Sequence, residues 1–391
     1  MTAGKNATTV ESTRGTARLR VLNTRRVLTA MRQLREPVRI SELAETTSLT
    51  RPTVSNIVAT LEARGWLDRH EPAGTAGRPA IRFAVALDRF AVIGADAGAH
   101  RAVVEVASLD GTRKARLQHR RPIQLGEDML SVLGTLVSDA LVETGLTRAA
   151  VLAATVASPG IVEESSGGIE LRPGLGAWTA AEVVGALATS VSGHVAVEND
   201  ANLAARAMRT VPDMPEDFLS LQWGQRLGAG LVLDGQIYRG RHGAAGELGA
   251  LLVRDPATGR RCHLEQVVRS DRLPLHGELP ELSTEELISR ADAGDAVALS
   301  ALAQGIDPLA AAVAPLCVGL ELRTVAISGG IARSGPALVT VLQERLAEHG
   351  ATGVECRLSA FQEDTVLRGA VQTAVDSGWE TLMEACDSDA D

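Results

Sequence analysis

One short run of polar residues has the chemistry to bind a polyhydroxylated small molecule. The sequence at 198–202 reads Glu-Asn-Asp-Ala-Asn, follows an alternating apolar stretch at 194–197 and precedes helical sequence. Carboxylates and amides accept or bridge adjacent hydroxyl groups, and open α/β sheets bind ligands where their strands end. We therefore expect Asn199 and Asp200 to contact a ligand. The alternative is that Asp200 only caps the following helix.

Two parts of the chain repeat the elements that such a site needs. The sequence at 91–111 predicts a strand, a glycine turn after Asp96 and a hairpin that bends at Asp-Gly. The same pattern returns at 218–235 with a second Asp-Gly bend. This repetition indicates an α/β fold of two related lobes that face one cleft.

The charge of the chain is divided unevenly. The 391 residues carry a net charge of -9, yet the part that ends at Arg82 has 14 Lys and Arg against 7 Asp and Glu, a net charge of +7. The remainder therefore carries -16, and only the first part suits a polyanion. Aromatic residues make up 2% of the chain, which leaves little for stacking on unpaired bases. We expect the partner to be double-stranded DNA.

The basic part predicts three helices and a hairpin. Asn23, Ser41 and Thr50 are the expected helix starts, and Pro52 suits the first turn of the third helix. That helix has a core stripe of Val54, Ile57, Val58 and Leu61. Its other face would read the major groove with Arg51, Thr53, Ser55 and Asn56.

The expected hairpin has strands at 66–70 and 81–85 and a tip at 74–79 that contains Gly-Arg-Pro. An extended tip with one charge suits a narrow minor groove, so Arg78 is a further candidate DNA contact. A single amphipathic helix with a solvated face would explain the third helix alone. The three helices and the hairpin together favour a winged helix-turn-helix.

These motifs resemble the ROK family (repressors, open reading frames and sugar kinases). The run at 198–202 is similar to the family's sugar-binding signature, and the Gly-Arg-Pro tip is similar to the wing of ROK repressors. The resemblance implies a two-lobed, actin-like (ribonuclease H-like) sugar-kinase body in which Asn199 and Asp200 hold the sugar and Asp200 would be the general base. It also aligns Glu247 and Glu265 with sugar-contacting residues. The alternative for Glu265 is an ordinary surface acid.

The resemblance fails in the two phosphate loops. The first loop continues Ala-His-Arg at 99–101, where the family usually has Gly then Thr, and the second reads Gly-Gln-Arg-Leu-Gly at 224–228 instead of Gly-Thr-Gly-x-Gly. Side chains at these positions obstruct the approach of backbone N–H groups to phosphate, although Arg226 could bind phosphate by charge. We expect no catalytic residue, no cofactor and no phosphoryl transfer.

The family's zinc motif is also incomplete. The matching stretch at 255–265 keeps Cys262 and His263 only, and Ala250 replaces a histidine that contacts both sugar and zinc in the family. A structural zinc needs four ligands. We therefore expect no metal.

The expected organisation follows from these motifs. We expect a lead without fixed structure at 1–17, the winged helix-turn-helix at 18–85, a ROK sugar-kinase-like body at 88–378 and an acidic tail at 379–391. The body would divide into two lobes, at 88–205 and 206–378. The four cysteines show no paired spacing. The N-terminus lacks the apolar core of a signal peptide, and the apolar run at 309–320 is shorter than the ~20 residues of a membrane span. We expect a cytoplasmic protein without a membrane partner.

The sequence thus predicts a transcription regulator, most simply a repressor, that binds a symmetric operator as a dimer or tetramer. A sugar or sugar-derived effector in the cleft would close the lobes and change the arrangement of the DNA-binding modules. One alternative is an active ATP-dependent sugar kinase with an added DNA-binding module. Another is a DNA-binding protein whose body serves only dimerisation or binds another protein.

Overall fold

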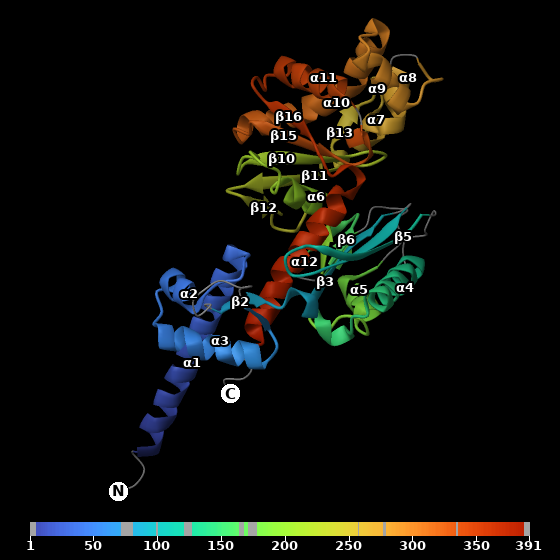
Figure 1. Ribbon diagram of the computed structural model, residues 1–391. Helices are drawn as coiled ribbons and strands as arrows, with labels where there is room; N and C mark the ends of the chain where they lie inside the picture. The colour runs from blue at the N-terminus through green and yellow to red at the C-terminus, as the bar shows by residue number, and fades with distance from the viewer. Residues whose placement is uncertain are drawn as a thin grey trace.

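The computed structural model describes residues 5–71, 81–98, 101–120, 127–163, 168–170, 178–256, 258–276, 279–333 and 335–386. Figure 1 shows an N-terminal module, coloured blue, beside a body of two sheet-containing lobes. The C-terminal helix α12 (Thr365–Glu384), coloured red, runs from the lobes to the N-terminal module.

The N-terminal module contains α1 (Lys5–Leu34), α2 (Ile40–Thr47), α3 (Arg51–Ala63) and an antiparallel hairpin of β1 (Leu67–His70) and β2 (Arg82–Val85). The predicted start of α3 is present, because the Thr50 hydroxyl accepts a hydrogen bond from the Thr53 N–H. The predicted stripe of Val54, Ile57, Val58 and Leu61 is buried. The hairpin tip at 74–79 lies outside the described residues.

The first helix differs from the prediction. We expected a lead without fixed structure at 1–17 and a helix start at Asn23, whereas α1 begins at Lys5 and contains Asn23 in its interior. Its later turns are anchored by Val27, Leu28 and Met31, which are buried. Once a helix is nucleated, each further residue adds one hydrogen bond, so a Thr- and Ala-rich segment continues an anchored helix.

The first lobe is built on a five-stranded sheet in the order β5-β4-β3-β6-β9. Its strands are β3 (Ala91–Ala97), β4 (Ala102–Ala107), β5 (Arg113–His119), β6 (Val151–Ser158) and β9 (His194–Asn199). Strand β3 pairs antiparallel with β4 and parallel with β6, and β6 pairs parallel with β9. Helices α4 (Glu127–Thr144) and α5 (Ala180–Leu187) supply buried residues to one hydrophobic cluster with this sheet.

The second lobe repeats this sheet. Its order is β12-β11-β10-β15-β16. As in the first sheet, the strand that comes first in the chain, β10, pairs antiparallel with the next strand, β11, and parallel with β15, which pairs parallel with β16. The strands are β10 (Phe218–Trp223), β11 (Leu227–Leu233), β12 (Gln236–Tyr238), β15 (Thr324–Ser328) and β16 (Glu355–Leu358). The repeat that the sequence predicted is therefore present. Two small hairpins are added, β7 (Ile161–Glu163) with β8 (Gly168–Glu170) and β13 (Leu252–Arg254) with β14 (Arg261–His263).

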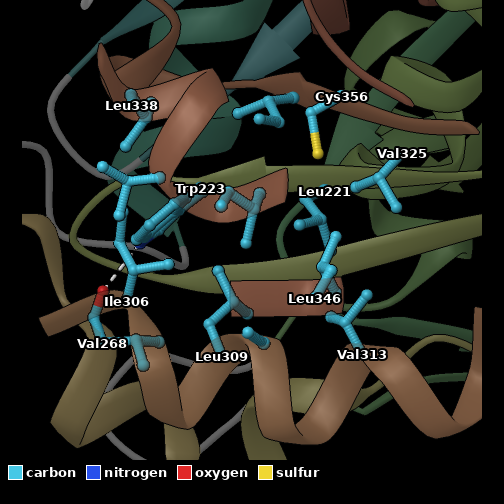
Figure 2. Packing of buried hydrophobic residues seen from close by; sticks show 14 of the residues in the cluster. Leu221, Trp223, Val268, Ile306, Leu309, Val313, Val325, Leu338, Leu346 and Cys356 are labelled. Carbon is cyan, nitrogen blue, oxygen red and sulfur yellow. Dashed lines mark hydrogen bonds between the residues drawn. The ribbon is translucent and has the colours of Figure 1, made fainter. Parts of the chain in front are cut away.

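Helices fill the second lobe and join it to the first. They are α6 (Asp200–Met208), α7 (Leu264–Val268), α8 (Leu273–His276), α9 (Thr284–Asp292), α10 (Ala296–Gly319) and α11 (Pro336–Glu348). Figure 2 shows α10 residues Ile306, Leu309 and Val313 facing Leu221 and Trp223 of β10. The Trp223 indole N–H donates to the Val268 carbonyl at 2.7 Å, so this buried polar group is satisfied.

Helix α10 is long and apolar enough, by length and composition alone, to cross a membrane. In the described part of the chain it lies in the core of the second lobe, and Pro308 and Pro315 stand within it. Its apolar residues are explained by contacts with neighbouring helices and the sheet.

Helix α12 corrects two expected boundaries. We assigned 206–378 to the second lobe, yet α12 packs on β3 and β6 of the first sheet. We also expected an acidic tail from residue 379, whereas Trp379, Leu382 and Cys386 are buried, with exposures of 4%, 1% and 8%. Their cluster includes core residues of the N-terminal module, and burial of these apolar side chains holds the end of α12 in place.

Candidate ligand cleft and nucleic-acid interface

The four sequence-predicted ligand residues line one narrow cleft between the lobes. The cleft has a volume of about 50 Å³. It is lined by Pro159, Gly160, Ile161, Asn199 and Asp200 from the first half and by Gln222, Arg226, Leu227, Gly228, Glu247 and Glu265 from the second. Ligand pockets usually measure roughly 300–1,000 Å³. A sugar could therefore enter this cleft only if the lobes first moved apart, before they closed on the bound sugar.

Asn199 begins helix α6. Its side-chain oxygen accepts from the Asn202 N–H at 3.1 Å, and its amide group donates to the Gly160 carbonyl at 3.0 Å. The alternative that Asp200 caps the helix is therefore corrected: Asn199 is the cap, and Asp200 is the first helical residue. The bond to Gly160 joins the end of β9 to the loop after β6, and the bond from Asn202 caps α6, so both hold the backbone from which Asp200 extends.

Asp200 is the titratable group with the strongest perturbation in the cleft. Burial, the largest cause, acts together with the nearby carboxylates of Asp96 and Glu247 to raise the pKa of its carboxyl from 3.8 to about 7. The Ala201 N–H, which donates to Asp200 at 2.8 Å, and the Arg226 charge oppose this increase. A carboxyl group with a pKa near neutral can donate a hydrogen bond to a hydroxyl group when protonated and accept one from it when ionised.

Glu247 is placed by an unusual turn. The preceding Gly246 has φ of +89°, and a Cβ atom there would lie 1.9 Å from the Ala229 carbonyl oxygen. Only glycine tolerates this combination of left-handed backbone and close approach. The turn packs against β11, leads into the 3-10 helix Leu248–Ala250 and brings Glu247 into the cleft.

Glu265 lies at the start of α7 and is partly buried in the cleft rather than on the open surface. One of its carboxylate oxygens accepts from the Leu227 N–H at 3.1 Å. Sequence reasoning did not place Gln222 and Arg226 among the ligand residues, although both line the cleft. Gln222 is the partly buried residue before the last position of β10. Its place near the end of a strand, like that of Asn199 on β9, was the available signal.

The first phosphate loop contains an internal ion pair. Asp96, at the end of β3, accepts from the Arg101 guanidinium at 3.0 Å, and Arg101 also donates to the Glu363 carbonyl at 2.7 Å. Both charged side chains are largely buried, with exposures of 16% and 15%. Burial raises the pKa of Asp96, while Arg101 opposes the increase. Residues 99 and 100 lie outside the described residues.

The second phosphate loop uses its own backbone donors. The Gly224 N–H donates to the Arg226 carbonyl at 2.9 Å, and the Leu227 N–H donates to Glu265. Phosphate-binding loops work by pointing such N–H groups at the ligand. In this arrangement the N–H groups of Gly224 and Leu227 both have hydrogen-bond partners within the protein.

The residues that align with the family's zinc motif do not form a tetrahedral site. Cys262 and His263 are neighbours on β14, and the His263 Nδ1 lies 3.0 Å from the Ala250 carbonyl. Over the ranges that the structure describes, no group of three or more His, Cys, Asp or Glu residues could hold a metal ion. The residues present do not fit zinc.

The outer face of α3 presents polar groups to solvent. Arg51, Ser55 and Asn56 are exposed, whereas the Thr53 hydroxyl lies 2.8 Å from the Thr50 hydroxyl and belongs to the helix cap. The Thr53 hydroxyl therefore has a partner within the cap, whereas the other three side chains are open to solvent. Arg78 lies outside the described residues.

Comparison with known proteins identifies the class of each part. The family model described as ROK family matches residues 92–376, and the model described as IclR helix-turn-helix domain matches residues 21–71. The chain belongs to the ROK family. It combines a helix-turn-helix module with a ROK body, as the motifs predicted.

Individual relatives include both kinases and regulators. The chain is 27% identical over 241 residues to a glucokinase of Halalkalibacterium halodurans, covering 54% of this chain and 72% of that protein. It is 25% identical over 215 residues to a xylose repressor of Caldicellulosiruptor bescii, covering 54% of this chain and 53% of the repressor. The match thus spans about half of that repressor.

A solved structure shares the whole architecture. It is a ROK family transcriptional regulator described as a homologue of the E. coli MLC protein, with a TM-score of 0.74 and 20% sequence identity. The alignment covers 95% of this chain and 99% of the other. The predicted fold class, a winged helix-turn-helix on a two-lobed actin-like body, is confirmed.

Proposed function

We propose that this chain is a DNA-binding transcription regulator, most simply a repressor, whose body senses a sugar or sugar derivative and does not transfer phosphoryl groups. The observation that carries the proposal is the combination of an exposed polar face on α3 with a cleft that keeps Asn199, Asp200 and Glu247. The first supplies contacts for a DNA groove, and the second supplies hydrogen-bonding groups for a polyol.

The loss of phosphoryl transfer rests on the two phosphate loops. Transfer from a nucleotide depends on positioning and on donors that stabilise the charge of the phosphates. In the first loop, Asp96 is paired with Arg101. In the second loop, the N–H groups of Gly224 and Leu227 are satisfied within the protein. Nucleotide binding would have to break these bonds.

The partners follow from the same geometry. The effector would be a sugar or sugar-derived molecule held by Asn199, Asp200, Glu247 and Glu265, with Arg226 and Gln222 as additional lining residues. The DNA partner would be a symmetric operator, contacted by Arg51, Ser55 and Asn56 with Arg78 on the wing. A homo-oligomer, a dimer or tetramer, would place two modules on the two half-sites, in the cytoplasm where the DNA lies.

A second candidate function is an active ATP-dependent sugar kinase. The specific observation in its favour is the pKa of Asp200, about 7, because a general base works best when its pKa lies near the operating pH. The glucokinase of Halalkalibacterium halodurans is among the relatives.

One pair of assays separates the two candidates. Duplex fragments enriched from a genomic library by the full-length protein are tested by gel shift against bulk DNA, and ADP release is followed with ATP and common hexoses or amino sugars. The proposal expects preferred fragments and no sugar-dependent ADP release. Sugar-dependent turnover of ~1–10³ per second that disappears in Asp200→Asn would establish the kinase instead.

A further inference from the structure

Helix α12 contacts every part of the protein that the proposed function must couple. It packs on α6, which begins at the cleft residue Asp200, and on β3 and β6 of the first sheet. Its other end reaches α1 of the DNA-binding module, as the red helix in Figure 1 shows. A change in the cleft therefore has a continuous path of packed elements to the module.

The contact between α6 and α12 is made through backbone. A Cβ atom at Gly369 of α12 would lie 1.8 Å from the Leu203 carbonyl oxygen of α6. Close-packed interiors deform little, so two helices in backbone contact at this point move together rather than slide past each other. The mid-part of α12 is thereby tied to the helix that carries Asp200.

The end of α12 belongs to the core of the DNA-binding module. Trp379 and Leu382 share one hydrophobic cluster with Val27, Leu28 and Met31 of α1. The Trp379 indole N–H also donates to the Leu109 carbonyl at 2.9 Å, at the turn after β4. A cavity of about 750 Å³ lies beside this junction and is lined in part by Arg32, Leu109 and Trp379. The junction is thus anchored by buried side chains and a hydrogen bond, with a cavity at its side.

One carboxylate on α12 is hydrogen-bonded both to the cleft helix α6 and to α1 of the DNA-binding module. Asp376 of α12 accepts a hydrogen bond from Arg206 of α6 on one oxygen and from Arg32 of α1 on the other. The Arg32 guanidinium also lies over the Trp379 ring, 5.6 Å from its centre. Arg206 follows Asp200 by six residues, a distance of about 9 Å along a helix. The cleft helix and the DNA-binding module thus share a single acceptor.

We propose that Asp376 is a positioning residue that couples the ligand cleft to the DNA-binding module, an inference that rests on the proposed function. A ligand that widens the cleft moves the start of α6, and Arg206 at its other end changes its position relative to Asp376. Because both guanidinium groups share one carboxylate, a change in one bond alters the other and the orientation of α1. The side chains of Arg32, Asp376 and Arg206 are 36%, 38% and 26% exposed, and partly exposed ion pairs are weak enough to rearrange reversibly.

Hydrogen exchange on the full-length protein without DNA or sugar tests the connection directly. In Arg206→Gln, a change on α6, we expect amides at 27–34 of α1 to exchange about 2- to 5-fold faster, the range of an exposed ion pair. Asp376→Asn should give the same change, and Arg206→Lys should restore part of the protection. The matched control is Arg209→Gln, an exposed arginine at the end of the same helix, which should leave α1 unchanged. Equal exchange of α1 in the wild type, Arg206→Gln and Asp376→Asn would overturn the inference.

A DNA-binding measurement separates this inference from the proposed function. Affinity for an enriched duplex fragment is measured with and without D-glucose, D-xylose or N-acetylglucosamine. We expect Asp376→Asn to keep the sugar-induced rise in melting temperature and to lose most of the sugar-induced change in DNA affinity. A full response in Asp376→Asn would contradict the coupling role. Absence of specific DNA binding by the wild type would refute the proposed function, while the exchange experiment would still decide whether Arg206 acts on α1.

Discussion

The raised pKa of Asp200 leads to a prediction about stability and pH. In the folded protein the carboxyl has a pKa of about 7, compared with 3.8 when it is free in water. Between these two values the folded state binds the proton and the unfolded state releases it. Stability linked to this group is therefore largest at low pH, falls as pH rises from about 4 to 7, and changes little above 7.

The size of the effect follows from the two pKa values. The difference between about 7 and 3.8 corresponds to roughly 4 kcal/mol, at about 1.4 kcal/mol for each tenfold change in proton affinity. Solvent reaches part of the Asp200 side chain, and screening reduces the value to about 1–3 kcal/mol. Asp200→Asn keeps the acceptor for the Ala201 N–H and removes the titration. We expect this variant to exceed the wild type in stability by that amount at pH 8.

Urea unfolding of both proteins from pH 5 to pH 8 measures the difference. The advantage of Asp200→Asn should be smaller at pH 5 than at pH 8, because much of the loss occurs between these values. Asp68→Asn, a change at an exposed position of β1, serves as the matched control and should follow the wild-type curve. Parallel curves for the wild type and Asp200→Asn would refute a raised pKa for the Asp200 carboxyl.

Three further changes test the packing and the charge pairs. Thr50→Ala should lower the stability of the N-terminal module by about 1 kcal/mol through loss of the α3 cap, and an unchanged urea midpoint would contradict this role. Arg101→Ala should cost roughly 1–3 kcal/mol, less than the loss of a fully buried pair, and Asp96→Asn in the same chain should recover part of it; additive losses would show that the pair does not interact. Gly369→Ala should cost at least about 2 kcal/mol by overpacking against Leu203, whereas Gly185→Ala, with no atom nearby, should not lower the melting temperature.

Local patterns in the sequence were sufficient for many elements. The stripe on α3 follows from the spacing of Val54, Ile57, Val58 and Leu61, because a helix of 3.6 residues per turn places them on one side. The two sheets follow from a repeated pattern of strand and turn. The meeting of Asn199 with Glu247 in one cleft follows from the family resemblance together with the repeat that predicted two lobes facing one cleft.

Features that depend on distant contacts could not be read in the same way. Arg101 meets Asp364 across 263 positions, and nothing local to either residue indicates this contact. The end of α12 has an acidic composition, but Trp379 is buried by contacts with α1 that only the folded chain creates. Asn and Asp are similarly good caps, so the choice of Asn199 over Asp200 depended on where β9 ends.

The central claim is that a sugar in the cleft changes the affinity of this protein for DNA. The most direct measurement is the fluorescence anisotropy of an enriched duplex fragment, titrated with the full-length wild type and with Asp200→Ala, with and without D-glucose, D-xylose or N-acetylglucosamine. Coupling between sites is usually 5- to 150-fold, and we predict a change of roughly that size for the wild type with at least one of these sugars. Asp200→Ala should lose the response and keep its sugar-free affinity. An equal response in both proteins, or no preference of the wild type for any fragment over bulk DNA, would contradict the account.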